Sequence, residues 1–331
     1  MKLFATSFLI LCCLSSGFGQ TAVGTSDETI QLSAEIVRLF DAGKFLETLP
    51  LAKAVVAKRE KSYGLDHIML GQSVRNLSYI ELKLNRRRDA LANFERALNI
   101  YELNEPLARS DQISQAEMFE TVGLVTIAEG APQRSVSKFQ QAIVIRERLH
   151  GLESPEITGL LNALGQVYSG QGEFAKSAPL LLRSLEIRKK LSLDDPTDNL
   201  LLRESAACAL NKIGRSAEAD EINLKFRTIS KNTLETPKDN TVDGGILNAR
   251  ALTLPVPEVP KQPKSSREDG KVNVRVLVNE TGRVVFACAV SGPRLFQSGA
   301  ETAAFRAVFS PVKFNGNAVK VSGTLTYDFL R

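Results

Sequence analysis

Few residues of this sequence have the types and spacing that catalysis needs. The two histidines, His67 and His150, each stand beside a Gly-containing turn, where an imidazole is expected to cap a helix or face solvent rather than act as a base. Ser-x-x-Lys occurs at 135–138 and 310–313, a spacing used by some serine nucleophiles, but both serines have structural explanations given below. We therefore expect no catalytic residue and no enzyme activity.

Motifs for cofactors, metals and nucleic acid are also missing from the sequence. The GQG of 170–172 has no strand before it that would make a phosphate-binding loop. The histidines and cysteines do not have the spacing of a metal site. Basic residues form no run with interleaved aromatics, the pattern that nucleic-acid binding favours. We expect no cofactor, no metal, no nucleic-acid partner and no small-molecule substrate.

Two cysteines remain once the apolar N-terminal segment is set aside. Cys12 and Cys13 belong to that segment, whereas Cys208 and Cys288 lie in what we interpret below as different domains. Two cysteines of an exported protein could form a disulfide, but the sequence gives no measure of the distance between them. We favour two unpaired, partly buried thiols over a disulfide.

The N-terminus has the three parts of a secretory signal peptide. Lys2 supplies a positive charge, Leu3 to Leu14 form an apolar run of 12 residues, and the GFG of 17–19 provides small residues before a cleavage point. A membrane-spanning helix needs about 17–25 apolar residues, so this run is short for an anchor. We predict a signal peptide over 1–19 that is cleaved on export, with an uncleaved inner-membrane anchor as the alternative.

The positive charge of the chain is concentrated at its C-terminal end. The net charge is +5, and the segment from Thr241 to Arg331 carries 12 Lys and Arg residues against 7 Asp and Glu residues. The rest of the chain is therefore close to neutral. A basic module of this size suits an acidic partner or a polyanionic surface.

Internal repeats organise the N-terminal two thirds of the chain. Similar segments begin 42, 45, 42 and 42 residues apart, at Phe45, Arg87, Pro132, Phe174 and Ser216. Each segment has a small residue three positions further on, namely Thr48, Ala90, Ser135, Ser177 and Ala219. A second small or slender residue follows in four segments, namely Val55, Ala97, Ala142 and Ser184. The helix before each of four segments also has a small residue, namely Ser78, Gly123, Gly165 and Ala207.

Small residues at this spacing indicate pairs of antiparallel helices that cross closely. Larger apolar residues at helical spacing would fill the grooves beside each crossing, and they include Val74, Leu77, Phe119, Val122, Leu161 and Leu164. A single helix pair buries too little surface to fold alone, so the pairs must stack into an array.

These segments resemble the tetratricopeptide repeat in the longer form found in kinesin light chain. The likeness rests on GKFLETLPLAKAV (43–55), LLNALGQVYSGQG (160–172), GEFAKSAPLLLRSLEI (172–187) and the turns GLDH (64–67) and GLES (151–154). The resemblance implies an all-α superhelical solenoid, which we place over residues 27–230.

The resemblance also implies which side chains would meet a partner. In the family, the first helix of each pair lines a concave face that binds protein or peptide segments. Mapped onto this sequence, those positions are Gln72, Arg75, Tyr79, Glu117, Glu120, Asn162, Gln166, Glu204 and Asn211. The charges of this face are mixed in sign, which favours a protein segment over a polyanion. The alternative is that the array only spaces other parts of the protein.

A proline-bearing linker leads from the array to an alternating C-terminal segment. We assign 231–245 to the linker and 246–331 to a second domain, which begins with an expected strand at 246–254. KVNVRVLVN (271–279) and RVVFACAV (283–290) are predicted strands, joined by a hairpin at Gly282.

The rest of this domain is predicted as a helix and a last strand. An alanine-rich helix is expected over 295–309 and is ended by Ser310-Pro311, because the residue before proline avoids the helical region. In the last strand, one face is apolar and turns inward, with Val319, Val321, Gly323, Leu325, Tyr327 and Phe329. The order is β-β-α-β, a small α+β domain with an antiparallel sheet.

This domain resembles the C-terminal domain of TonB, the energy transducer for outer-membrane receptors. The likeness rests on LPVPEVP (254–260), GKVNVRVLVNETGRVV (270–285), AVSG (289–292), FSP (309–311) and NGNAVKVSGTLTYDF (315–329). Val259 and Ala307 depart from the aromatic residues common in the family. The membrane anchor and long proline-rich linker of the family are missing as well.

In that family a partner adds a strand to the edge of the sheet. The strand of 319–329 is the last in the chain, so no following strand is obliged to cover its outer edge. We predict that it captures a partner segment through Lys320, Ser322, Thr324, Thr326 and Asp328. The alternative is that the 246–254 strand or a second copy of the domain occupies this edge.

The sequence thus predicts a multidomain α+β protein that acts as an adaptor or scaffold in a bacterial periplasm. Its expected partners are protein or peptide segments, among them an outer-membrane TonB-dependent receptor. Two alternatives stay open. The chain could be a membrane-anchored TonB-type energy transducer, or a structural spacer whose basic module rests on the cell wall.

Overall fold

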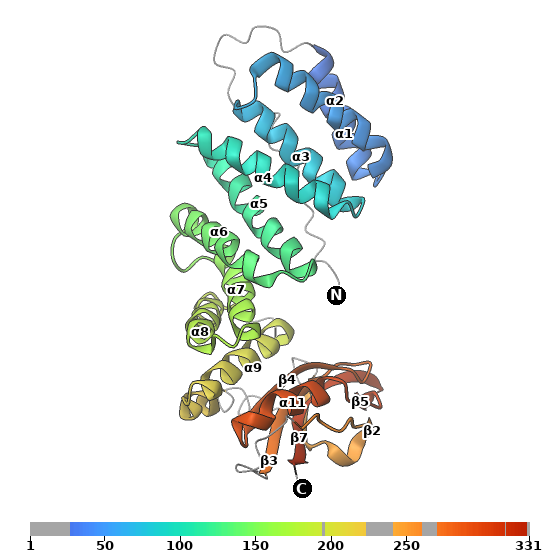
Figure 1. Cartoon of the computed structure of the whole chain (residues 1–331), viewed down its shortest axis with the longest axis vertical. Helices are drawn as coiled ribbons and strands as arrows, with labels where there is room; N and C mark the ends of the chain where they lie inside the picture. The colour runs from blue at the N-terminus through green and yellow to red at the C-terminus, as the bar shows by residue number, and fades with distance from the viewer. Residues whose placement is uncertain (1–26, 194–195, 223–240, 260–269, 315, 330–331) are drawn as a thin grey trace. The chain divides into compact units, whose positions relative to one another are not determined.

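The computed structural model describes five stretches of the chain, drawn in colour in Figure 1: residues 27–193, 196–222, 241–259, 270–314 and 316–329. They form two compact units, one up to Glu153 and one from Ser154 onward. The division therefore falls inside the predicted repeat array, not at the predicted linker. The predicted signal peptide of 1–19 lies outside the described residues.

The first unit is built from helical hairpins. Its helices are α1 Asp27–Asp41, α2 Phe45–Tyr63, α3 Ile68–Lys83, α4 Arg87–Leu103, α5 Arg109–Ala128 and α6 Ser135–His150. Helices α1 and α2, α3 and α4, and α5 and α6 pack as pairs, and α2 contacts α3 as α4 contacts α5. The second helices begin where the repeat predicts, except that a 3-10 turn, Pro132–Arg134, precedes α6.

One backbone feature makes each hairpin turn. Two residues before each repeat segment, which begin at Phe45, Arg87, Pro132, Phe174 and Ser216, the chain adopts a positive φ, at Gly43, Asn85, Gly130, Gly172 and Gly214. A left-handed residue at this place ends the first helix, because it lets the next N–H groups bond back to the last helical carbonyls. Glycine adopts this conformation without strain, and asparagine is among the few other residues that do so readily.

The predicted close crossings are confirmed. Thr48, Ala90, Ser135, Ser177 and Ala219 all have an exposed fraction of 0%. A Cβ added at Gly123 would lie 2.8 Å from the Phe139 ring, and one added at Gly165 would lie 2.7 Å from Leu181. The Ser177 hydroxyl donates to the Gly165 carbonyl at 2.7 Å, so the two backbones meet at this point.

Histidine 67 has the capping role expected for it. Its Nδ1 accepts a hydrogen bond from the Met69 N–H at 3.1 Å at the start of α3, and its ring stacks on Tyr63. Gly64 ends α2 and Gly151 ends α6, both with positive φ. These two glycines begin the predicted inter-repeat turns, 87 residues apart.

The second unit joins the last repeats to a sheet. Its helices are α7 Thr158–Gly170, α8 Phe174–Lys190, α9 Pro196–Lys212 and α11 Arg294–Phe305. Its strands are β1 Thr241–Ile246, β2 Ala251–Thr253, β3 Gly270–Val278, β4 Val284–Ser291, β5 Val308–Phe309, β6 Val312–Phe314 and β7 Asn317–Phe329. The main sheet has the order β1-β7-β3-β4, with β6 also on β7, while β2 and β5 form a separate ribbon.

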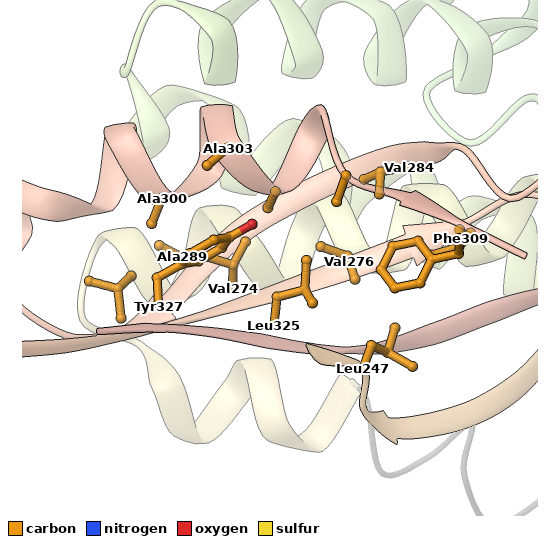
Figure 2. Packing of buried hydrophobic residues seen from close by; sticks show 14 of the residues in the cluster. Leu247, Val274, Val276, Val284, Ala289, Ala300, Ala303, Phe309, Leu325 and Tyr327 are labelled. Atoms are coloured by element: carbon orange, nitrogen blue, oxygen red, sulfur yellow. The ribbon is translucent and has the colours of Figure 1, made fainter. Parts of the chain in front are cut away.

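The core of this domain lies between the sheet and α11. Figure 2 shows Val274, Val276 and Leu325 on the face of the sheet that α11 covers, and Ala300 and Ala303 on the side of α11 that meets this face. The predicted inward face of the last strand is confirmed, since Val319, Val321, Gly323, Leu325, Tyr327 and Phe329 are all buried. The rings of Phe296 and Phe329 stack with centroids 4.4 Å apart.

Three sequence-based boundaries were wrong. The helix expected over 295–309 ends at Phe305, because residues 308–309 pair with β2 instead. The strand expected over 246–254 is broken by a 3-10 turn at Asn248–Arg250, which places the buried Leu247 in the core. Strand β1 begins inside the segment assigned to the linker.

Candidate partner-binding surfaces

The first-helix face of the first unit carries a cluster of polar side chains from α3, α5 and α6. Gln72 donates to Asp111 at 2.9 Å, and Arg75 donates to Ser114. Both bonds link α3 to the corresponding helix of the next repeat. They hold these two predicted contact residues in fixed positions on the face.

Tyr79 is more buried than a contact residue needs to be. Burial raises the pKa of the Tyr79 hydroxyl to about 12, although a hydrogen bond with Thr121 acts in the opposite direction. Its ring meets Phe94 edge to face at 5.0 Å. Tyr79 therefore packs against Phe94 of α4 and also interacts with the charged residues around it.

Those charged residues form a mixed cluster around Glu117. Burial raises the pKa of the Glu117 carboxyl to about 7, even though the charges of Arg146 and Arg75 lower it, and Glu120 adds to the rise. Glu120 forms an ion pair with Arg146 at 3.1 Å. The buried Nε of Arg146 has no hydrogen-bond partner among the described residues. The cluster thus brings charges of both signs together on α3, α5 and α6.

The predicted contact residues of the second unit have two different environments. Asn162 and Gln166 lie on α7 and bond to each other at 3.0 Å. Asn211 is partly buried on α9. Glu204 is different, because its side chain is only 4% exposed and lies against the C-terminal sheet. The prediction that Glu204 meets an external partner was therefore wrong, because Glu204 binds Arg275 of the same chain.

Glu204 belongs to a row of α9 residues that attaches the helix to the sheet. The single N–H of the Arg275 Nε is shared by both oxygens of the Glu204 carboxylate in a bifurcated hydrogen bond, with Nε–O distances of 2.9 and 2.7 Å. Arg275 also donates to Ser322 of β7 at 3.1 Å. A buried ion pair of this kind holds only if its remaining polar atoms are bonded, and Ser322 helps to meet that need.

The disulfide Cys208–Cys288 lies beside this ion pair, with 6.0 Å between its Cα atoms. The expectation of two unpaired thiols was wrong. Cys208 follows Glu204 by one helical turn on α9, while Cys288 is the register partner of Arg275 across β3 and β4. Residues four apart on a helix are neighbours, and so are opposed residues of two strands. The ion pair and the disulfide therefore form side by side, each joining one residue of α9 to one residue of the hairpin of β3 and β4.

Lys212 extends the row by another turn. Its Nζ is paired with Glu301 of α11 at 2.7 Å and donates to Gln297 at 2.8 Å. Glu301 in turn accepts from the Ala289 N–H at 2.7 Å. We call Glu204, Cys208 and Lys212 the α9 stripe. Their spacing of four residues was visible in the sequence, but nothing in it showed which surface they would meet.

The last strand does not have the free edge that the sequence predicted over its first half. β1 pairs in parallel with residues 320–324, and β3 pairs on the other side with residues 321–329. Ser322 is buried, Lys320, Thr324 and Thr326 are partly buried, and Asp328 is exposed. The physical reason is that residues before 246 return to the sheet, which strand order in the sequence cannot reveal.

Within the described residues, no group of three or more His, Cys, Asp or Glu side chains is placed to hold a metal ion. Among the helices of this same part of the chain, none has the length and hydropathy to cross a membrane.

Family comparisons match both parts of the chain. Residues 255–330 match the family described as Gram-negative bacterial TonB protein C-terminal, and residues 158–198 match the tetratricopeptide repeat. A comparison with curated protein sequences finds no match. The chain thus combines tetratricopeptide repeats with a TonB-type C-terminal domain, and both are binding folds.

Several solved structures are similar to this chain. The apo form of RapI has 15% identity and a TM-score of 0.50, over 64% of this chain and 56% of that chain. A putative kinesin light chain with TPR-like repeats from Podosopora anserina has 20% identity and a TM-score of 0.48, over 63% and 97%. BtubC (BKLC) from P. vanneervenii has 18% identity and a TM-score of 0.47, over 63% and 83%. At these identities only the fold is shared.

Proposed function

We propose that the chain is an exported periplasmic scaffold that binds protein partners through its repeats and through its TonB-type domain. The observation that carries the proposal is the α9 stripe, in which a disulfide and a buried ion pair join a repeat helix to the sheet. Disulfides persist in oxidising compartments and are rare in the cytosol. The Cys208–Cys288 bond therefore supports export, as does the apolar N-terminal segment.

The mixed cluster of α3, α5 and α6 is the surface that we assign to a partner segment. Arg75, Glu117 and Arg146 bring charges of both signs to this surface, and Tyr79 lies close enough to interact with Arg75 and Glu117. Charges of both signs on one surface suit the donors and acceptors of an extended chain, so a peptide or protein segment is the proposed ligand class.

A TonB-type energy transducer is the second candidate. The match of residues 255–330 to the TonB C-terminal family favours an outer-membrane receptor as a partner of this domain. In this candidate the N-terminal segment stays uncleaved as an anchor. Mass spectrometry of the chain from fractionated cells separates the two. A mature N-terminus near Gln20 in the osmotic-shock fraction supports the scaffold, and the full-length chain in washed inner membranes supports the transducer.

A pull-down from periplasmic extract tests the binding surface. Arg75→Glu combined with Asn162→Ala reverses one charge and removes one amide of the first-helix face, and capture should fall by about fivefold or more. Lys61→Glu makes the same charge change on the exposed end of α2 and should leave capture unchanged. If the double variant captures as much partner protein as Lys61→Glu does, the result would favour the spacer role of the repeats.

A further inference from the structure

The outer edge of β7 is filled by a short segment of the same chain. β1 pairs in parallel with β7, with Thr241 opposite Lys320 and Ile246 opposite Thr324. The Leu247 N–H then donates to the Thr324 carbonyl at 2.9 Å. The pairing continues past the end of the strand itself.

Asn248 completes this pairing with its side chain. Its Oδ1 accepts from the Thr326 N–H at 2.9 Å, and its Nδ2 donates to the Thr326 carbonyl at 2.6 Å. A backbone partner in a sheet would use the same donor and the same acceptor of Thr326. The segment 241–248 therefore satisfies the β7 edge from Lys320 to Thr326.

Leu247 anchors the segment in a recess that suits one side chain. It is 2% exposed and belongs to the core cluster, and Figure 2 shows it beside β7 and directed toward Leu325 and Phe309. A Cβ added at Gly323 would lie 2.6 Å from the Leu247 Cγ, and one added at Gly244 would lie 2.6 Å from its Cδ2. The two glycines thus leave the room that a leucine fills.

The rest of the segment is weakly held. The β1 register shifts between Asp243 and Gly245, Gly245 is exposed with a φ of 63°, and Ile246 is 72% exposed. By contrast, β3 pairs with β7 over nine consecutive residues and buries four valines. Burial of apolar surface and complete pairing stabilise a strand. The pairing of the internal segment is shorter and less regular than that of β3.

We propose that residues 241–248 are an internal competitor for the β7 edge, which an extended partner segment displaces. This inference rests on the proposed function and adds its regulation. The displacing segment pairs in parallel with residues 320–324 and places a leucine-sized side chain in the Gly323 recess. An amide side chain at the next position bonds Thr326 as Asn248 does. Without a partner, residues 241–248 occupy the β7 edge. Only a segment that binds this edge more tightly displaces them.

The probe for the test is a labelled synthetic peptide with the sequence of residues 241–250, TVDGGILNAR, added to the full chain. The parent chain should bind it poorly, because its own segment fills the edge. Leu247→Ala combined with Asn248→Ala weakens the internal segment, and affinity for the peptide should rise by about tenfold or more. A peptide with alanine in place of its leucine and asparagine should not bind. Leu252→Ala, at an exposed residue of β2, is the matched control variant.

Amide hydrogen exchange gives a second measurement that needs no peptide. Asn248→Ala removes both bonds to Thr326, and exchange at the Thr326 amide should become about tenfold faster or more, a factor that corresponds to about 1.4 kcal/mol. Amides shared by β3 and β4 should keep their rates. Because Asn248 is only partly buried, this variant answers the question even if the Leu247 change unfolds the domain.

The outcomes separate this inference from the proposed function. Unchanged exchange at Thr326, or no gain in peptide binding by a double variant that keeps its far-ultraviolet circular dichroism, overturns the internal competitor. Peptide binding as expected, together with a periplasmic pull-down that captures nothing, supports the competitor and overturns the scaffold.

Discussion

At the scale of single residues, Glu117 makes the proposed partner-binding face sensitive to pH. Its carboxyl is raised from the usual pKa of 4.5 to about 7, with burial as the main cause. A raised pKa in the folded state means that the folded chain holds this proton more tightly than the unfolded chain does. The folded state is thus favoured at low pH, and this contribution is lost as the pH rises from about 4.5 through 7.

Glu117→Gln should therefore stabilise the chain at pH 8 and have little effect at pH 4.5. The expected gain at pH 8 is about 1–2 kcal/mol, after allowance for the water that screens a partly exposed group. Thermal melts at the two pH values measure it. Glu102→Gln, which removes an exposed carboxyl from α4, is the comparison. A gain that is the same at both pH values would show that burial of Glu117 is not the cause.

Gly165 tests the close crossing of α7 and α8. A leucine at this position has no room, since even a Cβ would lie 2.7 Å from Leu181, and overpacking costs about 1–3 kcal/mol or more. A Cβ added at Gly159 in the same helix meets no atom within 4 Å, so Gly159→Leu is the matched control and should not destabilise. Circular dichroism during heating measures both variants. A melt of Gly165→Leu equal to that of the parent chain would mean that the crossing is misassigned.

The residue pattern of the repeats was predictable because it is local. Small residues that recur every 42 to 45 positions fixed where Ser135 and Ser177 would lie, and both are fully buried. Glu204 was misplaced because the same pattern assigns it to the partner face. The repeat specifies which side of a helix is concave, but not what covers that side at the end of the array.

At the scale of elements, the α9 stripe decides how the TonB-type domain is held within its unit. Helix α9 presents Glu204, Cys208 and Lys212 at intervals of four residues, and β3, β4 and α11 present their partners. Sequence alone predicted α9 and the hairpin of β3 and β4 correctly. It could not predict that they meet, because contact between distant elements depends on tertiary packing and not on periodicity.

Removing one side of the buried ion pair should be costly. Glu204→Ala leaves Arg275 without its counter-charge, and the free energy of unfolding should fall by about 3 kcal/mol. Glu204→Ala with Arg275→Met removes both charges and should cost less than the sum of the single changes. Glu218→Ala breaks the exposed pair with Arg215 and should change little. Strictly additive single effects, measured by urea unfolding, would show that the pair is not coupled.

The edge of β7 is a second case in which the sequence predicts an element but not its neighbour. Its alternation, its inward face and its pairing with β3 follow from the sequence. The parallel pairing with β1 does not, because TVDGGI (241–246) contains two glycines and an aspartate, which are poor strand formers. The pairing with β7 was therefore not visible in the strand's own sequence.

At the scale of the whole molecule, export and the disulfide should depend on each other. The apolar segment of 1–19 is expected to direct the chain out of the cytosol, where thiols are kept reduced. Only the exported chain should then contain the Cys208–Cys288 bond, which closes a loop of 80 residues. A disulfide across a loop of this length is typically worth about 2–4 kcal/mol. Export would thereby fix the attachment of the sheet to α9.

Expression of the chain with and without residues 1–19 tests this dependence. After acid quenching, denaturation and treatment with a thiol-reactive mass tag, the exported chain should gain no tag and the truncated chain should gain two, because removal of 1–19 also removes Cys12 and Cys13. The reduced chain should melt at a lower temperature, and oxidation after purification should restore the higher one. Cys208→Ser with Cys288→Ser should melt like the reduced chain under both conditions. Two tags on the exported chain would show that the thiols stay apart in the periplasm, and the attachment of α9 would then rest on the ion pairs alone.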